Sequence, residues 1–237
     1  MQFIDLHAQQ ARIKEEIDAN IAAVLHHGRY ILGPEVDLFE TNLAEFTQAK
    51  HAISCANGTD ALLLPLLAWD IGPGDAVFCP SFTYCATAEV IALRGATPVF
   101  VDIDRETYNM DADSLKTAIA QIQQQGMLTP RAVIVVDLFG QSADYNTLAP
   151  IIRDAGMKVI SDCAQGFGST LEGNHPLDWA DVQTTSFFPA KPLGCYGDGG
   201  AIFTNNDELA AKIAMVANHG QSKRYYHAII GVNSRLD

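Results

Sequence analysis

One lysine stands in a setting that is unusual for a solvated side chain. Lys191 lies among apolar residues, prolines and glycines in the string SFFPAKPLGCYGDGG, which begins at Ser186. Such neighbours remove water from the amine, and a desolvated amine is a competent nucleophile toward a carbonyl carbon. The sequence therefore predicts that Lys191 condenses with an aldehyde. The alternative is a buried lysine with a structural role.

A carboxylate follows another apolar run. Asp162 comes directly after the predicted strand 158–161 and begins the string DCAQGFG. A buried carboxylate is costly unless a cation or hydrogen-bond donors meet it, and a protonated pyridine nitrogen supplies both. Gln165, three residues further on, is then placed to contact the oxygen on the other edge of such a ring. The alternative is that Asp162 caps a following helix or turn.

Two further segments carry groups that suit a phosphate. Gly58 and Thr59 stand at a predicted strand-to-helix turn, where glycine lets a ligand approach the backbone and the N–H groups of the helix start favour an anion. Ser186, five positions before Lys191, adds a second hydroxyl. A plain turn without a ligand is the alternative interpretation of Gly58 and Thr59.

The amine, the carboxylate and the phosphate cradle together predict a binding site for pyridoxal 5′-phosphate (PLP). Tyr84, in the string PSFTYCATAE that begins at Pro80, follows another predicted strand and is placed to stack on the face of this cofactor. A packing role in the core or at an interface is equally open for Tyr84.

These turns need a fold that brings strand ends together. Short apolar runs alternate with helical stretches, which predicts an α/β fold with an open, mostly parallel mixed sheet and helices on both faces. Ligands bind in such sheets at the carboxyl ends of the strands. The predicted strands are 51–55, 76–79, 98–101, 132–136, 158–161, 182–187 and 201–204, and the helices between and after them are 59–69, 83–94, 113–124, 145–155 and 207–216.

Two helices are predicted ahead of this alternation. Apolar residues repeat at helical spacing over residues 13–25, and Gly33-Pro34 opens a second helix with proline at its first position. We therefore divide the chain into an N-terminal helical segment, residues 1–50, and a large cofactor-binding domain, residues 51–237.

Composition argues against several other classes of protein. The chain carries 15 basic and 28 acidic residues, a net charge of −13, which disfavours non-specific nucleic-acid binding. Scattered cysteines and histidines predict neither a disulfide framework nor a metal site. No apolar run suits a membrane span and the N-terminus lacks a secretory pattern, so we expect a cytoplasmic protein without a membrane partner. No G-x-G-x-x-G follows the first strand, which argues against a nicotinamide cofactor.

Five strings resemble the DegT/StrS family of nucleotide-sugar aminotransferases, and this resemblance covers essentially the whole chain. The string around Lys191 is the most specific, and the others are CANGTDAL, PSFTYCATAE, DCAQGFG and GVNSRLD. The resemblance implies the large domain of the PLP-dependent transferase fold type I, with glutamate as amino donor. It also implies a nucleotide-linked keto sugar, a UDP-3-keto-N-acetylhexosaminuronate, as acceptor, for synthesis of surface polysaccharide such as lipopolysaccharide O-antigen.

Roles for single residues follow from the same resemblance. Lys191 matches the Schiff-base lysine, and Asp162 matches the residue that pairs with the pyridine nitrogen. Gln165 contacts the ring oxygen and Tyr84 stacks on the ring. The residues implied to bind the phosphate are Gly58, Thr59 and Ser186.

The resemblance also implies a homodimer whose subunits share active sites. Asn233, in the GVNSRLD string, would reach the phosphate of the neighbouring subunit's cofactor, and Arg235 would face an acidic sugar across that interface. In the family this string leads into a long helix and a C-terminal small domain. Because the sequence stops at Asp237, we expect that domain to be missing, with the chain either a fragment or a natural truncation.

Two other functions suit the same fold. PLP-dependent sugar dehydratases carry histidine at the lysine position, so Lys191 argues against that reaction. A truncated, non-catalytic paralogue that binds PLP or a partner without turnover is the remaining alternative. Release of 2-oxoglutarate from glutamate separates it from an aminotransferase.

Overall fold

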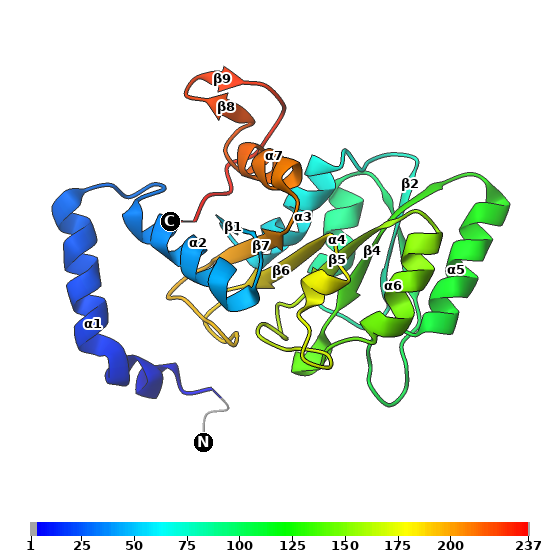
Figure 1. Ribbon diagram of the computed structural model, residues 1–237, viewed down its shortest axis with the longest axis horizontal. Coiled ribbons are helices and arrows are strands. Elements are labelled where there is room, and N and C mark those ends of the chain that lie inside the picture. Colours follow the sequence, from blue (N-terminus) through cyan, green and yellow to red (C-terminus); the bar gives the residue numbers. More distant parts are fainter. Residues whose placement is uncertain (1–3, 237) are drawn as a thin grey trace.

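The runs rich in Val, Ile and Phe form a seven-stranded sheet in the computed structural model, which describes residues 4–236 (Figure 1). Its strand order is β1-β7-β6-β5-β4-β2-β3. The strands are β1 (His51–Cys55), β2 (Asp75–Pro80), β3 (Thr97–Val101), β4 (Thr129–Val136), β5 (Lys158–Asp162), β6 (Val182–Ser186) and β7 (Gly200–Thr204). All seven predicted strands are present with only their ends shifted, and Asp162 itself closes β5.

One strand runs against the others. β7 pairs antiparallel with both β1 and β6, whereas the pairs that join β2, β3, β4, β5 and β6 are parallel. The predicted α/β fold with a mostly parallel mixed sheet is therefore confirmed. The carboxyl ends of the parallel strands meet at one edge, and each is followed there by a turn.

Helices cover both faces of the sheet, because each strand alternates its side chains between the two faces. α2, α5 and α6 pack on one face, and α3, α4 and α7 pack on the other. The helices are α1 (Leu6–His27), α2 (Pro34–Thr47), α3 (Gly58–Ala68), α4 (Ala86–Leu93), α5 (Ala112–Gln125), α6 (Tyr145–Asp154) and α7 (Asp207–Ala217), with two short 3₁₀ turns, η1 (Leu138–Gly140) and η2 (Pro176–Asp178).

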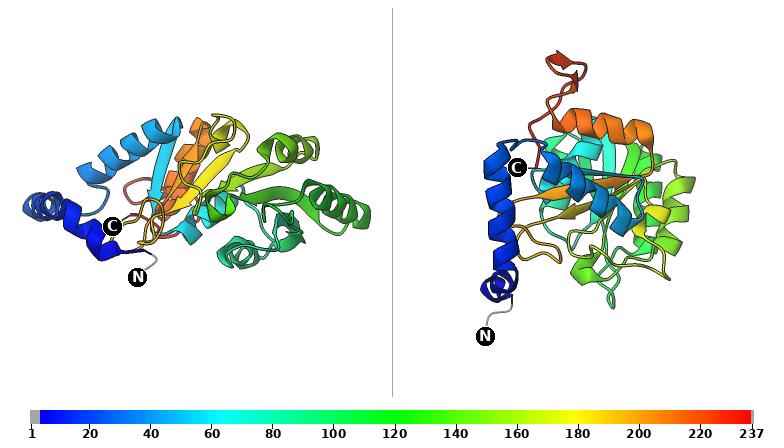
Figure 2. Two further views of the ribbon diagram at one scale, coloured as in Figure 1. Left: turned by 90° about the horizontal axis from the view of Figure 1, so that it is seen from below. Right: turned by 60° about the vertical axis from the view of Figure 1, so that its left-hand side comes forward.

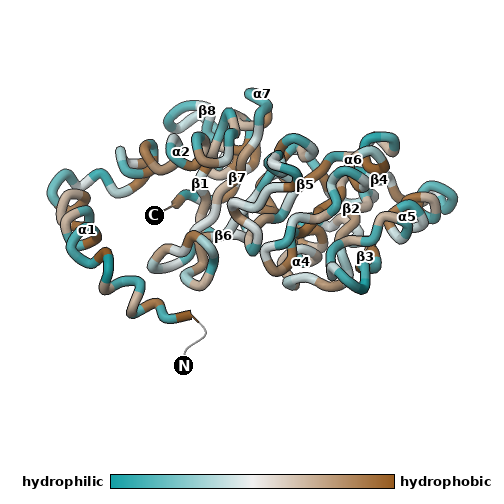
Figure 3. Tube along the Cα trace, turned by 60° about the horizontal axis from the view of Figure 1, so that its bottom comes forward, coloured by the Kyte–Doolittle hydropathy of each residue, from teal (hydrophilic) through white to brown (hydrophobic). Residues whose placement is uncertain are grey.

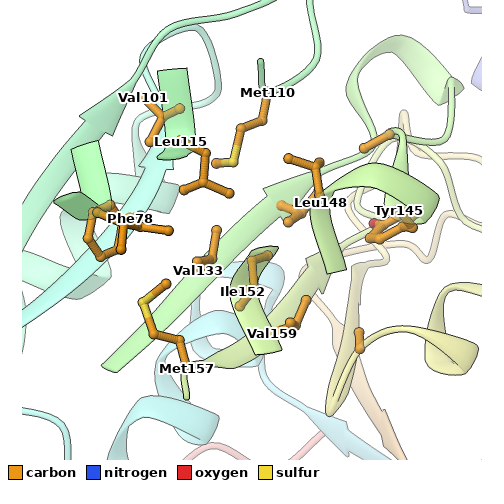
Figure 4. Close-up of a cluster of buried hydrophobic side chains, with 14 of the residues drawn as sticks. Phe78, Val101, Met110, Leu115, Val133, Tyr145, Leu148, Ile152, Met157 and Val159 are labelled. Carbon is orange, nitrogen blue, oxygen red and sulfur yellow. The ribbon is translucent and has the colours of Figure 1, made fainter. Parts of the chain in front are cut away.

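The largest part of the core lies between the sheet and helices α5 and α6. Phe78, Val133 and Val159 of the sheet belong to one buried cluster with Leu115 of α5 and Leu148 of α6 (Figure 4). Removal of such side chains from water is the main stabilisation of this face, at about 25 cal/mol per Å² of apolar surface. Tyr145 lies at the margin of this cluster, next to the ends of β4 and β5.

Two elements differ from the sequence prediction. The helix expected over 83–94 begins only at Ala86, because residues 83–85 form a turn in which the N–H of Thr87 donates to the carbonyl of Tyr84. A small hairpin, β8 (Gln221–Lys223) and β9 (Tyr226–His227), was not predicted, and in Figure 1 it projects beyond α7.

The two N-terminal helices behave differently. α2 packs on the sheet, since Leu43 is buried in a cluster with Phe187 and Phe203. α1 buries none of its residues, and it lies at the margin of the molecule in both views of Figure 2. Its tube changes between brown and teal along its length in Figure 3, as expected of mixed apolar and polar residues. The division of the chain at residue 50 stays a prediction.

Among the described helices, none combines the length and the apolar composition that crossing a membrane requires. Likewise, His, Cys, Asp and Glu side chains form no group of three or more suited to a metal ion within residues 4–236.

Candidate active site

A cavity of about 370 Å³ opens at the carboxyl edge of the sheet, between the turns that follow β1, β2, β5 and β6. Seven of the residues singled out in the sequence line it, namely Gly58, Thr59, Tyr84, Asp162, Gln165, Ser186 and Lys191. They come from four segments far apart in the chain. The parallel strands bring them together, because their carboxyl ends lie at one edge.

One corner of the cavity is formed by bare backbone. Asn57 caps α3 by accepting a hydrogen bond from the N–H of Asp60 at 2.8 Å, so the helix begins at Gly58. A Cβ atom at Gly58 would lie 2.5 Å from Cβ of Ser186, and one at Gly200 would lie 2.5 Å from the carbonyl oxygen of Asn57. The first N–H groups of α3 lack intrahelical acceptors and face a serine hydroxyl, an arrangement that suits a phosphate.

Replacing Gly58 with alanine is expected to weaken phosphate binding at this corner. The added methyl group must push the start of α3 away from Ser186, at a cost of roughly 1–3 kcal/mol in folding stability. We expect at least tenfold weaker PLP binding, measured by absorbance titration. Gly72→Ala is the control, since its new Cβ would meet only the carbonyl oxygen of Arg94 at 3.5 Å. Equal affinities of the two variants would contradict the prediction.

Asp162 also lines the cavity, with only 7% of its surface exposed. Burial raises the pKa of this carboxyl, while the N–H of Ala164 at 3.1 Å, the charge of Lys191 and the hydroxyl of Thr87 oppose the rise. The effect of burial is the larger, so the negative charge of the carboxylate is not fully compensated by the groups around it. A cationic N–H group in the cavity would supply what is missing.

Lys191 reaches the cavity from the loop after β6. The N–H of Lys191 donates to the carbonyl of Phe188 at 2.8 Å, which closes a tight turn, and a Cβ at Gly194 would meet the Pro189 carbonyl oxygen at 2.3 Å. The side chain is half-buried, so it is less enclosed than its apolar neighbours in the sequence predict. Its positive charge acts on Asp162, which places the amine and the carboxylate on walls of the same cavity.

Gln165 and Tyr84 complete the walls. The N–H of Phe139 donates to Oε1 of Gln165 at 2.7 Å, which leaves the amide NH₂ of Gln165 as its free donor. Tyr84 is 68% exposed and is free to pack against a flat ligand.

The sequence of the chain matches the model of one protein family. The model of the DegT/DnrJ/EryC1/StrS aminotransferase family matches residues 11–237. The chain belongs to this family. The resemblance inferred from the five strings is therefore confirmed.

Family members resemble the chain over its whole length. UDP-2-acetamido-2-deoxy-3-oxo-D-glucuronate aminotransferase of Pseudomonas aeruginosa is 56% identical over 100% of this chain and 64% of its own. A solved family aminotransferase from Brucella abortus is 52% identical, with a TM-score of 0.97 over 100% of this chain and 64% of its own. NtdA from Bacillus subtilis, solved with bound cofactor PMP (pyridoxamine phosphate), is 30% identical, with a TM-score of 0.88 over 99% of this chain and 52% of its own. The chain thus spans less than two thirds of each of these relatives.

Two predicted site residues of this family member lie away from its own cavity. Asn233 is exposed, and Nη1 of Arg235 donates to Oδ1 of Asn218 at 3.1 Å. Neither residue lines the cavity. Their predicted roles concern a neighbouring subunit, so they stay predictions.

Sequence reasoning missed some residues of this DegT/DnrJ/EryC1/StrS site. Thr83, Phe188 and Asp198 line the cavity, and the Thr87 hydroxyl acts on Asp162. Thr83 and Phe188 stand in strings that were already singled out, so their position after a strand was an available signal. Thr87 stands in the same string as Thr83, but it gave no such signal, because it is the second residue of α4 and is fully buried.

A second buried acid lies behind the cavity, at the end of β4. The side chain of Asp137 is fully buried and accepts hydrogen bonds from the N–H of Ala143 at 3.0 Å, the hydroxyl of Tyr145 at 2.9 Å and the thiol of Cys163 at 3.2 Å. Burial raises the pKa of Asp137 from 3.8 to about 6, although these hydrogen bonds oppose the rise.

Asp137→Asn is expected to change how stability depends on pH. A carboxyl whose pKa is higher in the folded than in the unfolded chain binds protons more tightly when folded. Its contribution is therefore lost as the pH rises from 3.8 through about 6. The full loss is at most about 3 kcal/mol, and on the order of 1 kcal/mol of it falls between about pH 5 and about pH 8.

Asparagine does not titrate, so the variant should gain that amount relative to the wild type between these two pH values. Urea unfolding of both proteins at each pH measures the difference. Parallel curves for the two proteins would show that Asp137 does not titrate in this range.

Proposed function

We propose that the chain binds PLP in this cavity and transfers an amino group from glutamate to a nucleotide-linked keto sugar. The observation that carries the proposal is that the amine of Lys191, the carboxylate of Asp162 and the Gly58–Ser186 corner line one cavity. They supply partners for the aldehyde, the pyridine nitrogen and the phosphate of one small molecule. The choice of PLP as cofactor is supported by the related protein NtdA, which was solved with PMP, the amino form of PLP.

Each residue that lines the cavity has its own role in the proposed reaction. PLP, when bound, supplies a ring that withdraws electrons from the carbon next to the transferred nitrogen. The Asp162 carboxylate accepts the ring N–H and favours the protonated ring. Nζ of Lys191 would hold the aldehyde carbon until the amino group of glutamate displaces it, and the freed amine would then take up and return the proton of the substrate carbon. The NH₂ group of Gln165 donates to the ring oxygen, and Tyr84 packs on the ring.

The proposed acceptor is a UDP-linked 3-keto-N-acetylhexosaminuronate, used in surface-polysaccharide synthesis such as that of O-antigen. Its support is the 56% identity to the Pseudomonas aeruginosa enzyme, whose name describes that 3-oxo sugar. The proposal includes glutamate as amino donor and the cytoplasm as the place of reaction.

The proposal also includes a homodimer and the division into residues 1–50 and 51–237, with PLP bound by the second part. Asn233 is exposed and lies outside the cavity of its own subunit, so it is available to a neighbour. Arg235 would then stand near an acidic sugar in the neighbouring site. Size-exclusion chromatography with light scattering measures the oligomeric state.

The test of the function is the release of 2-oxoglutarate from glutamate by the PLP-loaded chain. We expect a single equivalent without acceptor and continuous release when the UDP-3-keto sugar is added, because the cofactor must return to its starting form. PLP binding without any 2-oxoglutarate would contradict the aminotransferase and support the non-catalytic alternative.

A further inference from the structure

Four buried side chains form a closed ring of polar contacts behind the cavity. The hydroxyl of Tyr145 contacts both Asp137 and Ser161, the Ser161 hydroxyl contacts the Cys163 sulfur at 3.1 Å, and the Cys163 thiol donates to Asp137 at 3.2 Å. Each of these four residues is at most 1% exposed. We call them the polar ring.

The polar ring and the cavity lie on opposite faces of the sheet. Ser161 and Cys163 flank Asp162 in the chain, and alternation turns their side chains away from the cavity that Asp162 lines. Tyr145 belongs to the cluster between the sheet and helices α5 and α6 (Figure 4). Its ring stacks on Trp179 with centroids 5.7 Å apart. The polar ring therefore supports the end of β5 from behind.

The segment 137–139 holds the turn 162–169 at several points. The N–H of Asp137 donates to the carbonyl of Asp162 at 3.0 Å, and the hydroxyl of Ser169 donates to the Asp137 carboxylate at 3.5 Å. Between them the N–H of Phe139 holds Oε1 of Gln165 at 2.7 Å. The fit is close, because a Cβ at Gly166 would lie 2.7 Å from Cβ of Asp137.

The place of Asp137 calls for a side chain that accepts several hydrogen bonds. Donors converge on Asp137 from a backbone N–H, a phenol, a thiol and a serine hydroxyl. An ionised carboxylate only accepts and has room for all of them. Its removal would leave several buried donors without partners, each of which costs free energy.

We propose that Asp137 is a positioning residue, whose carboxylate fixes the turn 162–169 so that Asp162 and Gln165 face one cavity. Asp137 itself does not line the cavity, so it would touch neither cofactor nor substrate. That the turn positions Asp162 and Gln165 for cofactor binding rests on the proposed function. That Asp137 fixes the turn is a property of the protein without any ligand. The two are tested separately.

The first test is hydrogen exchange of the cofactor-free chain. In Asp137→Ala the amides of residues 162–169 are expected to exchange at least tenfold faster, while those of β7 keep their rate. The matched control is Asp181→Ala, because Asp181 accepts from the N–H of Val159 at 2.9 Å at the other end of β5. Unchanged exchange at 162–169 in Asp137→Ala, or equal acceleration in both variants, would overturn the proposal.

The second test is PLP binding to the same variants. Asp137→Ala should bind PLP on the order of tenfold more weakly, by analogy with residues that orient the protein ligands of a bound metal ion. Asp137→Asn should recover most of this loss, since its amide oxygen still accepts from Ala143 and Tyr145. Wild-type affinity in Asp137→Ala would overturn the proposal. A wild-type chain that binds no PLP would refute the proposed function, and hydrogen exchange would still decide the role of Asp137.

If Asp137→Ala does not fold, hydrogen exchange of Tyr145→Phe tests the same proposal. It removes one hydroxyl from the polar ring and keeps the stacking on Trp179. Faster exchange confined to 162–169 is the expected result, and an unchanged rate there would count against the proposal.

Discussion

Lys191→Ala is expected to lower the rate of amino transfer by roughly 10³-fold or more. The lysine has two tasks in the proposed reaction, binding the aldehyde and carrying a proton, and proton transfer by a positioned side chain alone contributes about 10²–10⁴-fold. Alanine supports neither task. PLP should still bind through Asp162 and the Gly58–Ser186 corner, but more weakly.

Single-turnover release of 2-oxoglutarate from glutamate measures this loss, and absorbance shows whether PLP is bound. Lys158→Ala is the control, because Lys158 lies at the far end of β5 and pairs with Asp181 at 3.0 Å. In the wild type, borohydride reduction with PLP should attach the cofactor to a peptide that contains Lys191. Attachment to another lysine, or normal turnover in Lys191→Ala, would refute the assignment.

Asp162→Asn is expected to have effects of opposite sign on stability and on function. Burial raises the pKa of this carboxyl, so the charged form is disfavoured in the folded chain without a ligand. A neutral amide should therefore leave the cofactor-free protein as stable as the wild type, or more stable. The same amide cannot favour a protonated ring nitrogen, so turnover should fall by roughly 10²–10³-fold, the scale for loss of one electrostatic partner.

Urea unfolding without PLP and the glutamate half-reaction with PLP measure the two effects. A variant that loses activity only because it loses stability would show the opposite pattern, with a lower urea midpoint in the cofactor-free protein. Asp162→Glu keeps the charge but lengthens the side chain in a buried place, and it should retain more activity than asparagine. If asparagine retained more, the charge of Asp162 would not matter for the reaction.

Local patterns were enough to predict the sheet and most of the cavity. The apolar runs predicted each strand of the seven-stranded sheet. The ends of these strands and the turns after them supplied Gly58, Asp162, Ser186 and Lys191, all of which line the cavity. Asp137 shows where this reasoning fails. It follows the run 132–136 as Asp162 follows 158–161, but its side chain points to the opposite face of the sheet. Val136, not Asp137, pairs with Asp162 across β4 and β5, so the side chains of Asp137 and Asp162 point to opposite faces. The local sequence around each aspartate does not contain this pairing.

Other features depend on contacts that local patterns do not contain. Helical periodicity extended the helix before β3 to residue 83, whereas the turn 83–85 stays open beside the cavity. The half-buried state of Lys191 depends on how its loop folds back after Phe188. Asn233 and Arg235 are predicted to act on a neighbouring subunit, and one subunit does not test that role.

The place of β7 has a consequence for the order of folding. Within residues 4–236, β1 is an edge strand that pairs only with β7. In the chain, β2 to β6 all lie between these two strands. Closing so long a loop is slow, because its entropy is lost before the contacts form. We therefore expect the corner that holds Gly58 against Ser186 to assemble last during refolding, so that regain of cofactor binding lags behind regain of helical circular dichroism.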